Sequence, residues 1–119
     1  MTLPDDWQEA ISKGQYTKST IDSTLEDVGF IHCSMPEQSI DIANRKYLDY
    51  DSLLLLFIDL SKVKPDVKFE AAISGRAGIF PHIYGPLNVE AVYKTVVLKK
   101  DNGKFVSPIE LTRLNQEKS

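Results

Sequence analysis

Five side chains of this sequence could do chemistry together if the fold brings them to one place. They are His32, Ser34, Glu70, His82 and Tyr84. Imidazole groups exchange protons near neutral pH, and a carboxylate stabilises positive charge that develops on a reacting ligand. A tyrosine ring offers a flat face for stacking, and a serine hydroxyl donates or accepts a hydrogen bond. We expect these side chains to line one small-molecule cleft.

The first two of these residues lie in the stretch GFIHCSMPEQ, for which alternating residue types predict a strand over residues 28–34. Side chains alternate across a strand, so His32 and Ser34 share one face, while Ile31 and Cys33 share the other. We interpret Cys33, the only cysteine, as a small buried hydrophobe, because nothing in its expected surroundings stabilises a thiolate.

Two signals disagree about the role of Ser34. Ser34 and Glu37 have the S-x-x-E spacing of a capping box, which would use the serine hydroxyl to begin a helix. Pro36 instead favours the first helical position, which makes Met35 the N-cap and releases the Ser34 hydroxyl. If the proline decides the matter, the serine and a helix N-terminus face the same space as His32.

The other three residues belong to two further segments. A strand is expected over residues 66–72, with Glu70 opposite its apolar face, either solvated, paired with a nearby cation or functional. FPHIYGPL, residues 80–87, is expected to be extended, because prolines disfavour helix. It places His82 and Tyr84 on one face, where they could either stack on a planar ligand or form a rigid packed corner. Gly85 has no side chain and so permits another group to approach the backbone closely.

The remaining elements must position these residues. Apolar spacing predicts a helix over residues 4–13, which Gly14 ends, and a helix of about three turns after residue 38. Residues 15–27 lack a sustained period and are expected to be a loop that can include one short turn, and residues 74–78 are expected to be a flexible loop. The other predicted strands cover residues 53–58 and 89–99, and the Asn-Gly pair within residues 101–104 predicts a hairpin.

Early helices followed by several strands indicate an α+β fold in which the helices pack on a mostly antiparallel sheet. At 119 residues the chain is most simply one domain, which we place at residues 1–107, followed by a polar tail at residues 108–119. The tail is expected to fray or to form a short helix.

Composition excludes several classes of function. The net charge of −3 and the pI near 5.3 argue against binding nucleic acid through phosphate neutralisation. The longest apolar run, residues 53–58, is too short to cross a membrane.

A single cysteine and an N-terminus without a secretory signal favour a cytoplasmic protein. One cysteine and two distant histidines lack the spacing of a metal site, so no metal is expected.

Four motifs in order resemble one family closely, the domain-of-unknown-function family numbered nine-five-two. They are Trp7 to Tyr16 (W..A...G.Y), residues 29–38 (GFIHCS..EQ), the FE pair at 69–70 and residues 80–92 (FPHIYGPL...AV). The resemblance covers about residues 5–107. It implies a fold similar to that of the ADP-ribosyltransferases, in which a split antiparallel sheet holds NAD.

This resemblance implies a nucleotide site. NAD, ADP-ribose or a related nucleotide is the expected ligand and NAD the candidate cofactor, with Ser34, His82, Tyr84 and Gly85 in binding roles. Glu70 and His32 are the candidate catalytic residues for an ADP-ribosyl transfer.

The sequence departs from the family pattern at its start. Only six residues precede Trp7, and none is the histidine or arginine that the first strand of the transferases supplies. We expect either an N-terminal truncation or a site without that contact. The alternative function is therefore a non-catalytic module that keeps the fold and binds a protein partner, or a second copy, through a free sheet edge.

Overall fold

The computed structural model describes residues 1–72 and 78–118, with side chains described as far as residue 114. Its helices are α1 (Pro4–Lys13), α2 (Leu25–Val28), α3 (Ser39–Lys46) and α4 (Ile109–Lys118), with short 3-10 turns η1 (Pro36–Gln38), η2 (Leu60–Lys62) and η3 (Val89–Ala91). Its strands are β1 (Gln15–Tyr16), β2 (Lys18–Thr20), β3 (Ser23–Thr24), β4 (Ile31–His32), β5 (Leu53–Ile58), β6 (Asp66–Ala71), β7 (Ile79–Tyr84), β8 (Leu87–Asn88), β9 (Val92–Leu98), β10 (Lys100–Asp101) and β11 (Lys104–Phe105).

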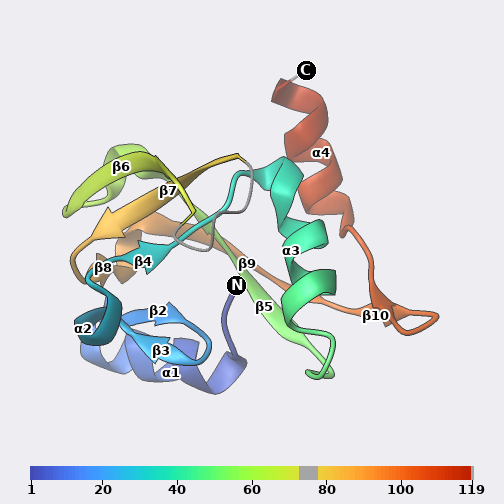
Figure 1. Ribbon diagram of the computed structural model, residues 1–119, viewed down its shortest axis with the longest axis horizontal. Coiled ribbons are helices and arrows are strands. Elements are labelled where there is room, and N and C mark those ends of the chain that lie inside the picture. The colour runs from blue at the N-terminus through green and yellow to red at the C-terminus, as the bar shows by residue number, and fades with distance from the viewer. Residues whose placement is uncertain (73–77, 119) are drawn as a thin grey trace.

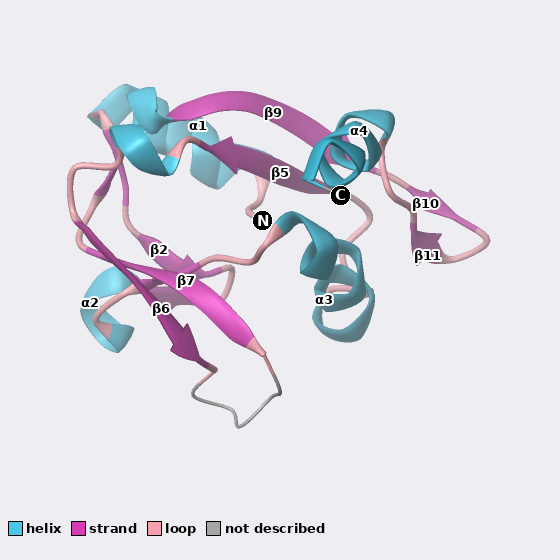
Figure 2. Ribbon diagram, turned by 90° about the horizontal axis from the view of Figure 1, so that it is seen from above, coloured by secondary structure: helices cyan, strands magenta, loops and turns pink. Residues whose placement is uncertain are grey.

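The expected α+β architecture is confirmed, and every strand pairing among the described residues is antiparallel. The two largest pairings are a three-stranded sheet in the order β4-β7-β6 and the long ribbon β5-β9. Figure 2 shows them on opposite sides of the molecule, with the N-terminus between them. Helices α3 and α4 lie toward one end of the molecule, away from α1 and α2 (Figure 1).

Strand β5 joins the two hydrophobic cores. Leu54 packs in a core with Trp7, Ile31 and Ile83, whereas Leu53 and the residues that alternate with Leu54 pack in a second core. The second core contains Ile21, Ala43, Leu53, Leu55, Phe57, Leu98, Phe105 and Leu111. Because successive side chains of a strand point to opposite faces, an unbroken apolar run such as LLLLFI serves both cores at once.

The first helix forms as predicted. Pro4 occupies its first turn, Asp5 and Asp6 lie at its positive end, and Gly14 ends it in the left-handed conformation with φ 81°. Trp7 is buried and packs against Tyr16, with ring centroids 6.2 Å apart. This contact fixes the helix against the start of the following strand.

The prediction of a loop over residues 15–27 is wrong, because β1, β2, β3 and α2 lie there. Strand β2 pairs with β3 next to it, and β1 pairs with the distant β8. Strands of two or three residues are too short to show a period, so pairing and not local pattern creates them. Thr24 begins α2, since its hydroxyl accepts a hydrogen bond from the Asp27 amide at 3.2 Å.

The strand predicted over residues 28–34 is shorter than expected. Helix α2 extends to Val28, and Gly29 ends it with φ 97°, so β4 begins only at Ile31. The Cys33 amide still donates to the carbonyl of Pro81 on β7, 3.0 Å away, which extends the ladder beyond the named strand.

Helix α3 is anchored to the hairpin that the Asn-Gly pair forms. The amide of Asn44 donates to the Phe105 carbonyl at 3.1 Å, and the Asn44 carbonyl oxygen accepts from the Phe105 amide at 2.8 Å. Asn102 and Gly103 have φ of 54° and 81°, as a tight hairpin requires.

The C-terminal segment forms α4, whose Leu111 is 2% exposed in the second core. Of the other strand predictions, residues 53–58 are confirmed, and the strand expected at 89–99 begins at Val92 because η3 precedes it. The loop predicted at residues 74–78 lies outside the described residues except for Gly78.

Candidate functional site

The three-stranded sheet gathers four of the five candidate residues on one face. His82 lies on the central strand β7 and pairs in register with His32 on β4 and with Lys68 on β6. The two imidazole rings are 5.3 Å apart between centroids and meet edge to face. Residues 28–34, 66–72 and 80–87, far apart in the sequence, thus present their polar faces to the same side, as their alternation predicted.

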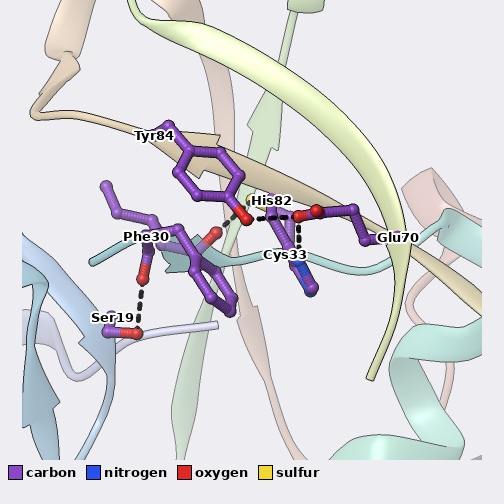
Figure 3. Close-up of polar contacts among 7 residues, drawn as sticks. Ser19, Phe30, Cys33, Glu70, His82 and Tyr84 are labelled. Atoms are coloured by element: carbon purple, nitrogen blue, oxygen red, sulfur yellow. Dashed lines mark hydrogen bonds and ion pairs between the residues drawn. The ribbon is translucent and has the colours of Figure 1, made fainter. Parts of the chain in front are cut away.

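Glu70 links two of these side chains by hydrogen bonds to a single oxygen. The Tyr84 hydroxyl donates to Glu70 Oε1 at 2.5 Å, and His82 Nδ1 lies 3.0 Å from the same atom. Figure 3 shows both side chains directed at the Glu70 carboxylate. These hydrogen bonds, the one from Tyr84 above all, lower the pKa of Glu70 below its usual value of 4.5, so the carboxyl group is ionised at neutral pH.

His82 is held in a buried and well-defined position. Its side chain is 2% exposed, and the ring of Phe30 stacks on it with a centroid distance of 4.1 Å and an interplanar angle of 25°. Its second ring nitrogen, Nε2, is buried without a hydrogen-bond partner among the described residues. Buried polar atoms in proteins nearly always have a hydrogen-bond partner, so an unpartnered nitrogen on a side chain that lines a pocket is an unusual feature.

A pocket of about 360 Å³ lies in front of this face. Its described lining contains Met1, Ser19, Thr20, Val28, His32, Cys33, Ser34, Ile42, Lys46, Tyr47, Ala72, Phe80 and His82. None of these lining residues is acidic. Lys46, at the end of α3, is the one lysine or arginine among the described lining residues. The side chains of the pocket therefore include hydroxyl groups, two imidazoles and the ammonium group of Lys46, which suits an anionic ligand with hydroxyls.

His32 is more exposed than His82 and forms the rim of the pocket. Burial lowers the pKa of His32, and the neighbouring His82 and Lys46 lower it further. A neutral imidazole at this position can both accept and donate a hydrogen bond at neutral pH.

The structure answers the question about Ser34 in favour of the proline. Pro36 occupies the first position of η1, Met35 is the N-cap, and the Gln38 side chain accepts from the Met35 amide at 2.7 Å. Ser34 Oγ lies 3.0 Å from Ser39 Oγ and lines the pocket. Glu37 thus forms no capping box with Ser34, because the helical turn begins one residue later than that box requires.

Two predicted binding residues lie outside the pocket lining. The ring of Tyr84 is 5.2 Å from that of Phe30, and the Lys68 ammonium lies 4.8 Å above it, so protein groups occupy the surroundings in which a ligand ring would stack. Gly85 lies where β7 ends, and a Cβ there would come within 2.9 Å of Pro65. Glu70, a candidate catalytic residue, contacts His82 Nδ1 and is not among the described lining residues.

Cys33 packs against the first core and is also one of the residues that line the pocket. Burial raises the pKa of its thiol to about 11, and Sγ contacts the Ile31 carbonyl at 3.9 Å. A thiol with this pKa carries almost no thiolate at neutral pH. The arrangement agrees with the structural role expected for this cysteine.

Two residues that the sequence analysis did not single out complete the site. Phe30 fixes the plane of the His82 ring, and Lys46 supplies the positive charge. Phe30 shares the strand alternation of His32, and Lys46 follows Ile42 at helical spacing, so both signals were present in the sequence. The sequence did not show where α3 packs against the sheet, so it could not show that Lys46 and His82 line the same pocket.

The fold and this site define a small α+β protein in which a buried histidine and a lysine line one pocket. A family model described as "Protein of unknown function (DUF952)" matches residues 1–95. The chain belongs to this family, as the motifs indicated. It is also similar to the crystal structure of protein CC0527 from Caulobacter crescentus, with 31% identity and a TM-score of 0.77. That match covers 93% of this chain and 94% of the other.

A double mutant of CC0527 gives the same likeness, with 31% identity and a TM-score of 0.77 over 93% of this chain and 94% of that one. No curated protein matches. Across the helices that the structure describes, none combines the length and the apolar character needed to span a membrane. No group of three or more histidine, cysteine or acidic side chains within residues 1–72 and 78–114 is arranged to hold a metal ion.

Proposed function

We propose that the pocket in front of His82 binds a small phosphate-bearing ligand with free hydroxyl groups. NAD, ADP-ribose and related nucleotides are the class that we assign to it first. The observation that carries the proposal is His82 Nε2, a polar atom that is buried, unpartnered and part of a side chain that lines the pocket. A ligand that hydrogen-bonds to this atom removes the cost of leaving it unsatisfied.

The charge of the pocket supports a phosphate group. Lys46 lines it without a competing carboxylate among the described lining residues, and Ser34 and His32 add hydrogen-bond partners. Charge-assisted hydrogen bonds to phosphate are stronger than neutral ones. The antiparallel arrangement of β4-β7-β6 opposite β5-β9 also agrees with the split sheet of an ADP-ribosyltransferase-like fold, which is part of this proposal.

The proposal concerns binding, and it gives Glu70 a supporting role. Glu70 contacts His82 and Tyr84 and does not line the pocket, so it cannot touch a ribosyl group there without moving. A transfer reaction in this pocket would therefore depend on His82 and His32 as the groups that meet the ligand.

A thermal-shift screen tests the proposal, with NAD, ADP-ribose, AMP, pyrophosphate and adenosine as probes. A ligand at about 100 times its dissociation constant stabilises by roughly 2.7 kcal/mol, which raises the Tm of a domain of this size by on the order of 10 °C. We expect shifts with ADP-ribose and AMP and a smaller one with adenosine, which has no phosphate. The proposal fails if no phosphate-bearing probe shifts the Tm, or if His82→Phe and Lys46→Gln respond as the wild type does.

The second candidate function is binding of a protein, or a second copy of this chain, at the edge strand β6. Phe69 on β6 and Ile79 on β7 are each 54% exposed and lie on the face opposite the pocket. Exposed apolar residues on an edge strand favour pairing with another chain. Sedimentation of the wild type and of Phe69→Glu would separate this candidate from the first, since only self-association depends on Phe69.

A further inference from the structure

The contact between His82 and Glu70 indicates which of the two ring nitrogens carries the hydrogen in a neutral ring. Glu70 Oε1 accepts a hydrogen bond from the Tyr84 hydroxyl and lies 3.0 Å from His82 Nδ1. An ionised carboxylate has no proton to give and only accepts hydrogen bonds, so Nδ1 must carry the hydrogen. A neutral imidazole carries a hydrogen on one nitrogen alone, which makes Nε2 a hydrogen-bond acceptor.

The His82 ring is held in one orientation by its neighbours. Phe30 stacks on His82 and Glu70 Oε1 lies 3.0 Å from Nδ1, so the ring cannot turn about its Cβ–Cγ bond without losing both contacts. Nε2 is the atom left buried without a partner. His82 and Lys46 both line the pocket, so a buried acceptor atom belongs to one lining side chain and an ammonium group to another.

We propose that Glu70 and Tyr84 hold His82 in the Nδ1–H tautomer, and that the pocket thereby selects a ligand hydroxyl as the group bound at Nε2. This inference rests on the proposed function for the existence of the ligand. Glu70 is a positioning residue: it decides whether Nε2 accepts or donates without touching the ligand. A ligand with only phosphate oxygens at this position meets an acceptor and is rejected.

Histidine-ring NMR tests the tautomer without any ligand. The chain has only two histidines, so a protein labelled with ¹⁵N-histidine gives two ring spin systems, and His32→Asn assigns the one that remains to His82. We expect a protonated Nδ1 and an unprotonated Nε2 in the wild type. A protonated Nε2 in the neutral ring of the ligand-free wild type overturns the inference.

Variants of Glu70 test its positioning role. Glu70→Ala removes the acceptor, so His82 should shift toward the Nε2–H tautomer, which isolated histidine favours. Glu70→Gln keeps an oxygen acceptor and should keep Nδ1 protonated. Glu90→Ala, which removes a carboxylate paired with Lys64, is the matched control. A tautomer that stays unchanged in Glu70→Ala contradicts the role of Glu70.

A titration with ADP-ribose then tests whether a ligand hydroxyl binds at His82 Nε2. At saturation, Nε2 of the wild type should remain unprotonated and show the shift of a hydrogen-bonded acceptor, and the affinity should fall about tenfold in Glu70→Ala. Protonation of Nε2 on binding contradicts selection of a hydroxyl. If ADP-ribose and the other phosphate-bearing probes fail to bind while the wild-type tautomer is as expected, the proposed function fails and the assignment of the tautomer stands.

Discussion

His82 shows how much of the site depends on single residues. Its Nδ1 lies within hydrogen-bond distance of the Glu70 carboxylate and its ring stacks on Phe30, while its Nε2 is buried without a partner among the described residues. A histidine buried for packing alone would be expected to have both nitrogens satisfied. The asymmetry between the two nitrogens is the reason that we assign a function to this pocket.

The hydrogen bonds to Glu70 predict an acid-dependent loss of stability. They lower the pKa of Glu70 in the folded protein, so the stabilisation is present above the unfolded value near 4.5 and is lost as the pH falls through the folded pKa. Glu70→Gln should therefore lower the Tm at pH 7 and have less effect near pH 3. Circular dichroism melts across this range check the prediction, with Glu110→Gln on α4 as a control. A Tm difference that grows as the pH falls would contradict it.

Removal of the positive charge should weaken ligand binding. Lys46→Gln keeps most of the side chain and deletes the ammonium group, which should reduce the affinity for ADP-ribose by roughly tenfold and weaken the dependence on salt. Isothermal titration at two ionic strengths measures both effects. Lys104→Gln, an exposed lysine on the hairpin, is the matched control and should bind like the wild type.

At the scale of elements, the local pattern predicted which residues share a face, but not which strands pair. Alternation placed His82 and Tyr84 on one face of β7, and the structure agrees. The contact of Glu70 with His82 depends on the register of β6 against β7, which pairs Lys68 with His82. Register arises from the packing of both faces and from the connection between the strands, and the sequence of one strand does not contain it.

Short elements were the least predictable for the same reason. β1 exists because Tyr16 pairs with Leu87, more than seventy residues later, and not because QY prefers a strand. In contrast, the six apolar residues of β5 and the caps of α1 are local signals, and both elements were predicted within the observed bounds.

The link between α3 and the C-terminal hairpin should matter for stability. Asn44→Ala removes two hydrogen bonds to the backbone of Phe105 and leaves a buried amide and carbonyl without partners. We expect the free energy of unfolding to fall by about 1–3 kcal/mol. Urea unfolding measures this loss, and Lys104→Ala on the same hairpin should change it far less. Equal effects of the two variants would show that Asn44 does not anchor the helix.

At the scale of the whole molecule, one strand holds two cores together. Leu54 of β5 faces the core of Trp7 and Ile83, and Leu53 faces the core of Leu98 and Leu111. A strand that is shared in this way cannot leave one core without exposing the other. The pocket lies where the sheet of the first core meets helix α3 of the second.

This arrangement predicts a single cooperative unfolding transition. Leu53→Ala, at a fully buried site, should cost about 2–5 kcal/mol, and Ile83→Val should cost about 0.5–1.5 kcal/mol. In both variants the fluorescence of Trp7, which reports on the first core, should change at the same urea concentration as the circular dichroism. Separate transitions for the two signals would show that the cores unfold independently.

The central claim is that the pocket in front of His82 binds a phosphate-bearing ligand through its two histidines and Lys46. Its most direct test is a titration of ¹⁵N-histidine-labelled protein with ADP-ribose, followed through the ring signals of His32 and His82. We predict saturable shifts of both rings in the wild type, and a weaker response at the same concentrations in Lys46→Gln. Ring signals that stay unchanged up to millimolar ADP-ribose would contradict the account.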